Sequence, residues 1–399
     1  MKTQFAKIDS LCQAHPTLSS RFNIYRKNNT LSLQAKDLGQ ARFCATNYQL
    51  TDNARKFAYD TFWMKIQKPV TKHREFCVFM RDYLDDAVEA FGGNISYSIR
   101  DHYKEYASND EEMALLARWA KLIDEVTPII EAEPTFEAKV RKSQELDSLN
   151  ADLTKEVEKI FQTPRALKLQ NGGLLVNIMK RNLLVLDSLG ADPSIKDIRL
   201  TYKALEYIDN GRTSLLPSVI DTLRTMIGNP IYMAMIEKQN DHYLAIENRE
   251  FDKLVLKSSD DLKGISEGEA LLKKIIEPYK GKFVLLDIWG TWCGPCKEAL
   301  SHSTEEYARL NDFDIEYLYL ANNSPQNSWE NVIKEYNVSG DNVAHYNLPQ
   351  EQQAAIERYL NVHAWPTYKL FDRDGNLLDL EVNPRDLENL ARLLGKLTR

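Results

Sequence analysis

The segment from Phe283 to Cys296 constrains the fold more than any other part of the chain. Residues 283–289 are apolar, β-branched or aromatic apart from one acid, which predicts a short buried strand. Three residues later comes Cys293-Gly294-Pro295-Cys296, whose proline suits the first turn of a helix. A strand that runs directly into a helix in this way predicts a small sheet covered by helices.

The Cys-x-x-Cys motif places two thiols one helical turn apart, where free N–H groups and the helix dipole favour a negative charge. This position stabilises a thiolate at Cys293, and Cys296 is near enough to attack a mixed disulfide formed there. A structural zinc site would need a second Cys or His pair, and covalent haem would need a histidine where Lys297 stands. The motif therefore predicts a redox-active dithiol with no metal and no other cofactor.

Nearly every periodic signal before about Asn248 is helical. Apolar residues recur every three or four positions over 116–126 and again over 146–160, and the second run predicts one long amphipathic helix that ends near Pro164. Further helices are expected to begin at Pro217 and Pro230. Breaks between helices are expected at the turn signals Gly92-Gly93, Gly172-Gly173, Asp192-Pro193 and Asn210-Gly211.

The helical period is lost between Asn248 and Gly268, which predicts an all-helical region over residues 1–250 and an α/β domain over 251–399. The expected fold class is therefore α plus α/β. In the second domain, strands alternate with helices and a hairpin follows. The expected strands are 283–289, 315–320, 367–371 and 377–380, and the expected helices are 295–310, 328–336, 350–359 and 385–397.

The composition of the chain argues against some classes of binding partner. The formal net charge of −7 argues against nucleic acid or an anionic membrane surface, and no stretch approaches the ~18 apolar residues of a membrane span. The most apolar stretch of the helical region, 174–189, is interrupted by polar residues and predicts a buried helix. The first residues lack the pattern of a secretory signal, which leaves the compartment open.

Three further cysteines lie far from the motif, at Cys12, Cys44 and Cys77. Their apolar and aromatic surroundings predict buried, unreactive thiols. In an oxidising compartment, one pair of them bridged and the third free is the alternative.

Residues 283–297 resemble the active-site strand and loop of the thioredoxin superfamily almost position by position. The resemblance implies that Asp287, six residues before Cys293, is a buried acid that relays a proton to and from Cys296. An unpaired carboxylate in an apolar strand is costly, which raises its pKa and suits that role, although a capping or ion-paired acid is the alternative. Trp289 and Trp292 are implied to pack under and beside the dithiol.

Trp365-Pro366-Thr367 matches the cis-proline loop that faces the dithiol in this superfamily. Sixty-nine residues separate Cys296 from Pro366, and this long insert, with the Asp-x-Asp-Gly hairpin after it, resembles the TlpA/ResA group. Two departures stand out, because that group usually has a kinking proline where Ser301 stands and a smaller residue where Trp365 stands. A bulky indole there is expected to cover part of the dithiol and to reshape the substrate groove.

The resemblance implies a thiol-disulfide oxidoreductase of the extracytoplasmic or periplasmic space that reduces protein disulfides and maintains cell redox homeostasis, with an upstream thiol electron donor. A cytoplasmic enzyme is the alternative location. The catalytic residues are expected to be Cys293, Cys296, Asp287 and Pro366, and the substrate-binding residues Trp292, Gly294, Pro295, Trp365 and Thr367. The competing hypothesis is an interaction protein that works through its helical region, with the thioredoxin-like domain as a binding module of low turnover.

Overall fold

The computed structural model describes residues 2–45, 48–65, 73–91 and 100–398. The chain forms two compact units, one of Met1–Tyr207 with Leu215–Glu237 and the other of Ile208–Ser214 with Lys238–Arg399. The predicted order of a helical N-terminal region and a C-terminal α/β domain is confirmed. Besides residues 251–399, the second unit takes in residues 208–214 and 238–250.

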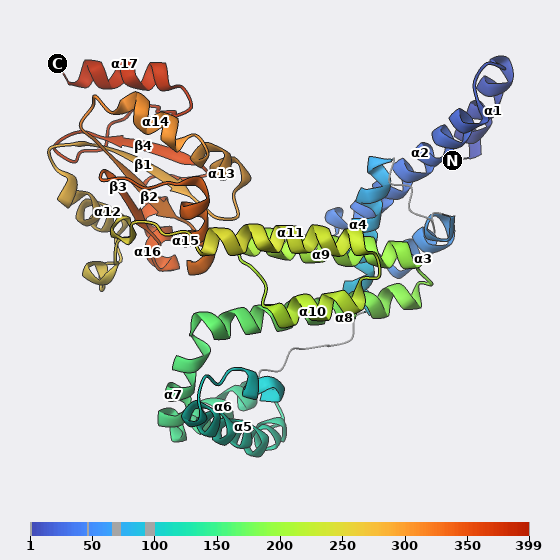
Figure 1. Ribbon diagram of the computed structural model, residues 1–399, viewed down its shortest axis with the longest axis horizontal. Helices are drawn as coiled ribbons and strands as arrows, with labels where there is room; N and C mark the ends of the chain where they lie inside the picture. Colours follow the sequence, from blue (N-terminus) through green and yellow to red (C-terminus); the bar gives the residue numbers. More distant parts are fainter. Residues whose placement is uncertain (1, 46–47, 66–72, 92–99, 399) are drawn as a thin grey trace. The chain divides into compact units, whose positions relative to one another are not determined.

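The first unit is helical throughout its described residues (Figure 1). One apolar cluster joins its second, third and fourth helices to the turn near Leu189, and another surrounds Leu116. The helices are α1 (Lys2–Ala14), α2 (Ser20–Gln40), η1 (Ala41–Cys44), α3 (Asp52–Thr61), η2 (Trp63–Lys65), α4 (Arg74–Phe91), η3 (Arg100–Glu105), α5 (Asp110–Glu131), α6 (Phe136–Leu149), α7 (Ala151–Phe161), α8 (Pro164–Ser188), α9 (Pro193–Gly211), α10 (Pro217–Met226) and α11 (Pro230–Glu247), of which α9 and α11 continue into the second unit.

The helix starts predicted at Pro217 and Pro230 are confirmed, as are the breaks at Asp192-Pro193 and Asn210-Gly211. The single long helix predicted over 146–160 is wrong, because the chain breaks at Asn150, between α6 and α7. The Asn150 side chain donates to the carbonyl oxygen of Leu146 at 2.8 Å, and this bond competes with continuation of the helix. The break at Gly92-Gly93 lies outside the described residues.

The predicted break at Gly172-Gly173 is also wrong, since α8 runs through both glycines. A Cβ atom on Gly172 would lie 2.5 Å from Cγ2 of Val219 in α10. Glycine therefore serves the close approach of two helices there rather than a turn.

Only one face of α8 is buried, so the prediction of a buried helix over 174–189 is wrong in that respect. Leu175 and Met179 are fully buried, whereas Leu174 and Leu184 are exposed. None of the helices in the described part of the chain is long and apolar enough to cross a membrane.

The three cysteines of the first unit do not have the predicted environment. Cys44 and Cys77 are exposed, Cys12 is half-buried, and all three are free thiols. Apolar neighbours in the sequence therefore did not mean burial, and Phe43, next to Cys44, is itself 51% exposed.

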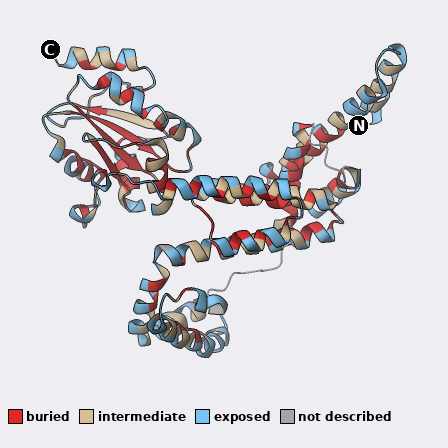
Figure 2. Ribbon diagram, in the orientation of Figure 1, coloured by how far each residue is buried: buried red, intermediate tan, exposed pale blue. Residues whose placement is uncertain are grey.

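The second unit contains a four-stranded sheet. Its strands are β1 (Phe283–Trp289), β2 (Ile315–Ala321), β3 (Val343–Tyr346) and β4 (Thr367–Phe371). Their order in the sheet is β3-β2-β1-β4, with β4 antiparallel to β1 and the other pairs parallel. The first three strands are buried along their whole length, whereas β4 is half-buried over its first three residues (Figure 2). The predicted bounds of strands 283–289 and 367–371 are confirmed.

Two strand predictions need correction. The sequence did not indicate β3, and residues 377–380 form no strand, because Leu377 makes only an isolated bridge to Phe371. The helices of this unit are η4 (Lys253–Val255), η5 (Asp260–Leu262), α12 (Gly268–Ile276), η6 (Glu277–Tyr279), α13 (Gly294–Leu300), α14 (Ser303–Leu310), α15 (Gln326–Tyr336), α16 (Gln350–Tyr359) and α17 (Leu387–Leu397).

Alternate residues of the strands face opposite layers of helices. Val284, Leu286 and Ile288 join α12 and α16 in one apolar cluster. Leu285 and Trp289 join α13, α14, α15 and α17 in another. Asp287 is two residues from Leu285 and two from Trp289, so its side chain points to the same face of the sheet as theirs. That face is covered by the layer that holds α13 and α14.

The helix predicted over 295–310 is two helices, because α13 ends at Leu300 and α14 begins at Ser303. The Ser301 hydroxyl donates to the carbonyl oxygen of Glu298 at 2.6 Å, a bond of the kind that bends or ends a helix. The serine that replaces the expected kinking proline therefore stands at a break in the helix.

Residues 208–214 pack against α15 within the second unit. The side chains of Ser328 and Asn331 donate to the carbonyl oxygens of Gly211 and Arg212 at 2.6 and 2.7 Å. Arg212 also forms a largely buried ion pair with Glu335. The chain that leaves α9 is thereby fixed to the α/β domain by polar contacts.

Candidate active site

The two motif cysteines form a disulfide at the point where β1 passes into α13. Their sulfur atoms are 2.07 Å apart and their Cα atoms 5.3 Å apart. Cys293 occupies the N-cap of α13, where its sulfur accepts the backbone N–H of Cys296 at 3.1 Å. Cys296 is fully buried, whereas Cys293 keeps 4% of its surface exposed. Cys293 is therefore the sulfur that another molecule can reach.

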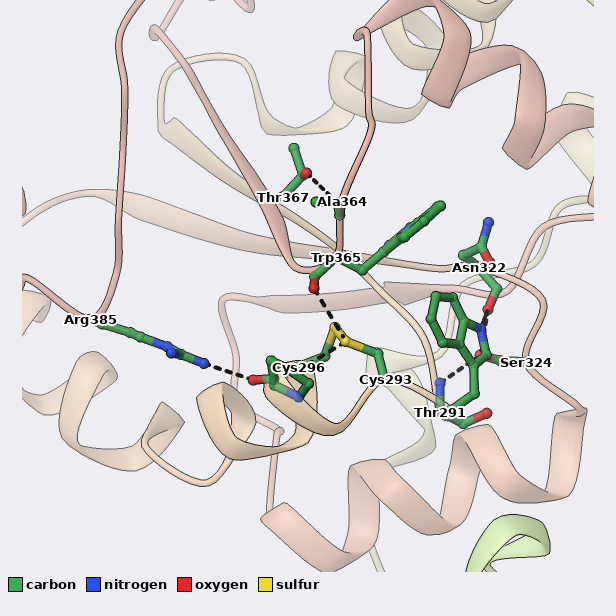
Figure 3. Close-up of a disulfide and its surroundings, with 11 residues drawn as sticks. Thr291, Cys293, Cys296, Asn322, Ser324, Ala364, Trp365, Thr367 and Arg385 are labelled. Atoms are coloured by element: carbon green, nitrogen blue, oxygen red, sulfur yellow. Dashed lines mark hydrogen bonds between the residues drawn. A yellow bond between two sulfur atoms is a disulfide. The ribbon is translucent and has the colours of Figure 1, made fainter. Parts of the chain in front are cut away.

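The loop before β4 lies against this disulfide (Figure 3). The peptide bond between Trp365 and Pro366 is cis, as expected, and the Trp365 carbonyl oxygen is 3.5 Å from the sulfur of Cys293. Thr367 begins β4 and pairs with Ile288 of β1, and its hydroxyl donates to the carbonyl oxygen of Ala364 at 2.6 Å. The sheet thus holds the proline loop beside Cys293.

Two tryptophans stand beside the dithiol and a third lies beneath it. The rings of Trp292 and Trp365 meet edge to face with centroids 5.3 Å apart, and the side chain of Trp292 is 50% exposed. Trp289 is fully buried in the same apolar cluster as both cysteines. Trp365 is only half-buried, so the indole expected to cover the dithiol leaves an exposed aromatic rim next to it.

A polar network that the sequence analysis missed fixes the Trp292 ring. The indole N–H donates to the carbonyl oxygen of Asn322 at 3.1 Å, and the Asn322 amide donates to both oxygens of Glu357 at 2.8 and 3.0 Å. The backbone N–H of Thr291 donates to the hydroxyl of Ser324 at 3.0 Å. Asn322 and Ser324 directly follow β2, next to the end of β1, and polar residues at that sheet edge were the available signal.

Replacing Gly290 with alanine is expected to displace Trp292. A Cβ atom there would lie 2.6 Å from the indole nitrogen and 3.1 Å from the Asn322 carbonyl oxygen, so one of these groups must move. We expect a loss of roughly 1–3 kcal/mol in the free energy of unfolding, with altered tryptophan fluorescence. Gly294→Ala is the matched control, since nothing lies within 4 Å of its Cβ position. Equal stability of the two variants would contradict this steric argument.

Asp287 lies in the middle of β1, between Tyr319 of β2 and Tyr368 of β4. It is 6% exposed and its Oδ1 atom has no hydrogen-bond partner among the described residues. Burial raises the pKa of Asp287 to about 8, although the Arg385 guanidinium acts to lower it. This environment is that of a carboxyl group that stays protonated at neutral pH while the disulfide is present.

Asp287 lines a cavity of about 290 Å³ under the first active-site helix, together with Ala299 and Leu300 of α13. Arg385 also lines this cavity and donates to the carbonyl oxygen of Pro295 at 2.8 Å. Sequence reasoning missed Arg385 and Glu306, a second buried acid in the cavity.

The predicted site residues therefore occupy two sides of one helix start. The outer side holds the exposed residues Gly294 and Pro295, the exposed edge of Cys293, the tryptophan rim and the proline loop. The buried side holds Asp287 and the cavity. Within the described ranges, no group of three or more His, Cys, Asp or Glu side chains is arranged to hold a metal ion.

Comparisons with known proteins match the same part of the chain. Residues 281–377 match a family model described as thioredoxin-like. The thiol-disulfide oxidoreductase ResA of Bacillus cereus (strain ZK / E33L) is 28% identical over 127 residues, which are 32% of this chain and 70% of that protein. ResA of Geobacillus kaustophilus is 25% identical over 119 residues, 30% of this chain and 65% of that protein.

Among solved structures, the thioredoxin domain of a thiol-disulfide oxidoreductase from Bacteroides vulgatus is 19% identical. It covers 31% of this chain and 84% of its own, with a TM-score of 0.26. The expected resemblance of the C-terminal region to ResA-like thiol-disulfide oxidoreductases is confirmed by the family model and the ResA relatives, which support a redox enzyme. The alternative of an interaction protein is not favoured.

Proposed function

We propose that this protein is an extracytoplasmic thiol-disulfide oxidoreductase that reduces disulfide bonds of other proteins through Cys293 and Cys296. One observation carries the proposal: the Cys293 sulfur is the accessible member of a disulfide at a helix start and lies 3.5 Å from the carbonyl oxygen of the cis-proline loop. At this position the helix N–H groups stabilise a thiolate on Cys293, and a peptide bound along the proline loop lies beside its sulfur.

The reaction transfers two electrons from the reduced dithiol to the substrate. The Cys293 thiolate attacks one sulfur of the substrate disulfide, forming a mixed disulfide and releasing the first substrate thiolate. Cys296 then loses its proton, and its sulfur attacks Cys293. The bond between Cys293 and the substrate breaks, the second substrate thiolate leaves, and the Cys293–Cys296 disulfide remains.

Asp287 is proposed to take the proton from Cys296 in the second step. The carboxyl faces the α13 side of the sheet and lines the cavity under that helix with Leu300, one turn after Cys296. Because burial raises its pKa to about 8 in the disulfide state, the acid keeps this proton at neutral pH after the reaction. The same proton is available to Cys296 when a donor reduces the disulfide again.

The substrate is proposed to bind as an extended segment along the backbone of Trp365, Pro366 and Thr367. Strand β4 is an edge of the sheet, so a peptide beside the loop before it extends the sheet by strand addition. The exposed rim of Trp292, with Gly294 and Pro295 at the helix start, supplies apolar contacts to its side chains.

The direction of the reaction is tested by the reduction potential of the Cys293–Cys296 pair. We expect a value near that of thioredoxin, about −270 mV, when the full chain is equilibrated with dithiothreitol buffers and free thiols are counted. A Cys293→Ser, Cys296→Ser double variant measures the thiols of Cys12, Cys44 and Cys77 for subtraction. A value near −120 mV would contradict a reductase and indicate an oxidase.

The similarity to ResA supports a location outside the cytoplasm, where the pair needs an upstream thiol donor to return it to the reduced state. The exposed thiols of Cys44 and Cys77 allow a test by labelling with a membrane-impermeant maleimide in spheroplasts. Labelling only after lysis would place the protein in the cytoplasm instead.

A further inference from the structure

The cavity under α13 contains a second buried acid that the proposed reaction does not use. Glu306 lies in α14 and is 9% exposed, and its side chain lines the same cavity of about 290 Å³ as Asp287. Among the described residues, no Lys, Arg or His side chain forms an ion pair with either acid. Two unpaired carboxylates in one buried space repel each other, so they do not both carry a charge at neutral pH.

One positive charge lies near the pair. Arg385 is the only lysine or arginine among the described residues that line the cavity, and its guanidinium acts to lower the pKa of Asp287. It forms no ion pair with either acid and donates to the carbonyl oxygen of Pro295. The other ionisable groups that face the pair come from α13, α14, β2 and β4. They are Glu298, His302, Glu305, Tyr307, Tyr317, Tyr319 and Tyr368.

The tyrosines stay protonated, because burial raises the pKa of each of them. The hydroxyls of Tyr307 and Tyr319 bond to each other at 2.8 Å. The hydroxyl of Tyr317 and the Oδ1 atom of Asp287 are buried and have no partner among the described residues. Buried polar atoms around a space of this size are the usual setting of ordered water.

We propose that Glu306 is a positioning residue that acts through Asp287 and passes protons between Asp287 and water in the cavity. The inference rests on the proposed function. Before Cys296 reacts, Glu306 gives its proton to cavity water, and the Glu306 carboxylate then takes the proton of Asp287. The Asp287 carboxylate accepts the proton of Cys296, so one proton reaches solvent for each thiol proton taken up. No electrons move in these steps.

The electrostatics of the two acids agree with this arrangement. Burial, followed by repulsion from Asp287, raises the pKa of Glu306 to about 8. Repulsion between two carboxylates is mutual, so the acid that ionises second does so against the charge of the first. Removing the charge of either acid is therefore expected to let the other ionise at lower pH.

The test is a carbon-13 NMR titration of the Asp and Glu carboxyl groups in the full-length oxidised protein. Replacing Glu306 with Gln is expected to lower the titration midpoint of Asp287 by at least about one pH unit. Replacing Asp287 with Asn is expected to lower the midpoint of Glu306 in the same way, and this reciprocal measurement stands even where one variant folds poorly. Glu305→Gln is the matched control, because that neighbouring side chain is 72% exposed.

A kinetic measurement complements the titration. Oxidation of the reduced dithiol by glutathione disulfide, followed by tryptophan fluorescence, is expected to show a pH midpoint that shifts downward in Glu306→Gln and not in Glu305→Gln. An Asp287 midpoint that is the same in both variants would overturn the inference. Insulin reduction by the wild-type protein tests the proposed function alone. An inactive wild-type protein would contradict that function, whereas an active protein with an unshifted Asp287 midpoint would contradict only the role of Glu306.

Discussion

Replacing Cys296 with serine is expected to trap substrate proteins as mixed disulfides on Cys293. The substituted chain still presents the accessible sulfur of Cys293 beside the proline loop, but it lacks the buried sulfur that releases the substrate. Replacing Cys293 with serine is expected to reduce insulin turnover on the order of 10³-fold or more, because no thiolate then attacks the substrate. Non-reducing gels and mass spectrometry of the Cys296→Ser protein measure trapping, and the rate of insulin reduction by the Cys293→Ser protein measures turnover.

The exposed thiols of the first unit provide the control for this experiment. Cys44→Ser and Cys77→Ser are expected to leave trapping unchanged, since both thiols are free and belong to the other compact unit. Adducts that map to Cys44 or Cys77, or no adducts at all in the Cys296→Ser protein, would contradict the proposed mechanism.

Replacing Asp287 with asparagine is expected to stabilise the second unit, and to do so more at pH 8 than at pH 5. Burial raises the pKa of this carboxyl from 3.8 to about 8 in the folded protein. Between these values the unfolded chain gives up the proton and the folded chain keeps it, so the wild-type free energy of unfolding falls as pH rises from about 4 to about 8. An amide does not ionise and escapes this loss.

The gain in the free energy of unfolding cannot exceed about 1.4 kcal/mol for each pH unit between the two pKa values. At pH 8 this limit amounts to several kcal/mol. Urea unfolding of the oxidised full chain, followed by tryptophan fluorescence, measures this gain; four of the six tryptophans belong to the second unit. Asp374→Asn, in an exposed turn, is the matched control and is expected to change little at either pH. An equal gain at pH 5 and pH 8 would show that the acid is not destabilised by its charge.

The elements that were predicted with correct bounds have strong local signals. Strand β1 is an apolar run of strand length, and α16 begins directly after a proline. Strand β3 was missed because it has only four residues and contains a histidine. His345 is fully buried and its Nε2 bonds to the carbonyl oxygen of Val338 at 2.8 Å, a tertiary contact that no local pattern indicates.

The site residues also fall into those that a local sequence pattern identifies and those that only the tertiary structure brings together. The cysteines and Trp292 were identified because they lie within one short segment, and the proline loop because it matches a known motif. Asn322 and Glu357 reach Trp292 only after the sheet has formed, so their role needs tertiary structure. Glu306 had a weak signal, since it lies on the buried side of α14 with Ser303 and Leu310, where an acid is unusual.

The attachment of residues 208–214 to α15 determines how the α/β domain can be isolated. A fragment that starts at residue 251 removes the acceptors of the Ser328 and Asn331 side chains and the carbonyl oxygen of Glu247 that accepts the Lys334 ammonium group at 2.8 Å. A contiguous fragment that keeps these acceptors must begin by Gly211 and so carries Leu215–Glu237 from the other unit. The buried apolar side of α10, including Leu223, then loses its packing partners, and such a fragment is prone to self-association. The redox domain is thus interleaved with the helical region along the chain, and its minimal autonomous version calls for a circularly permuted or spliced gene rather than a simple truncation.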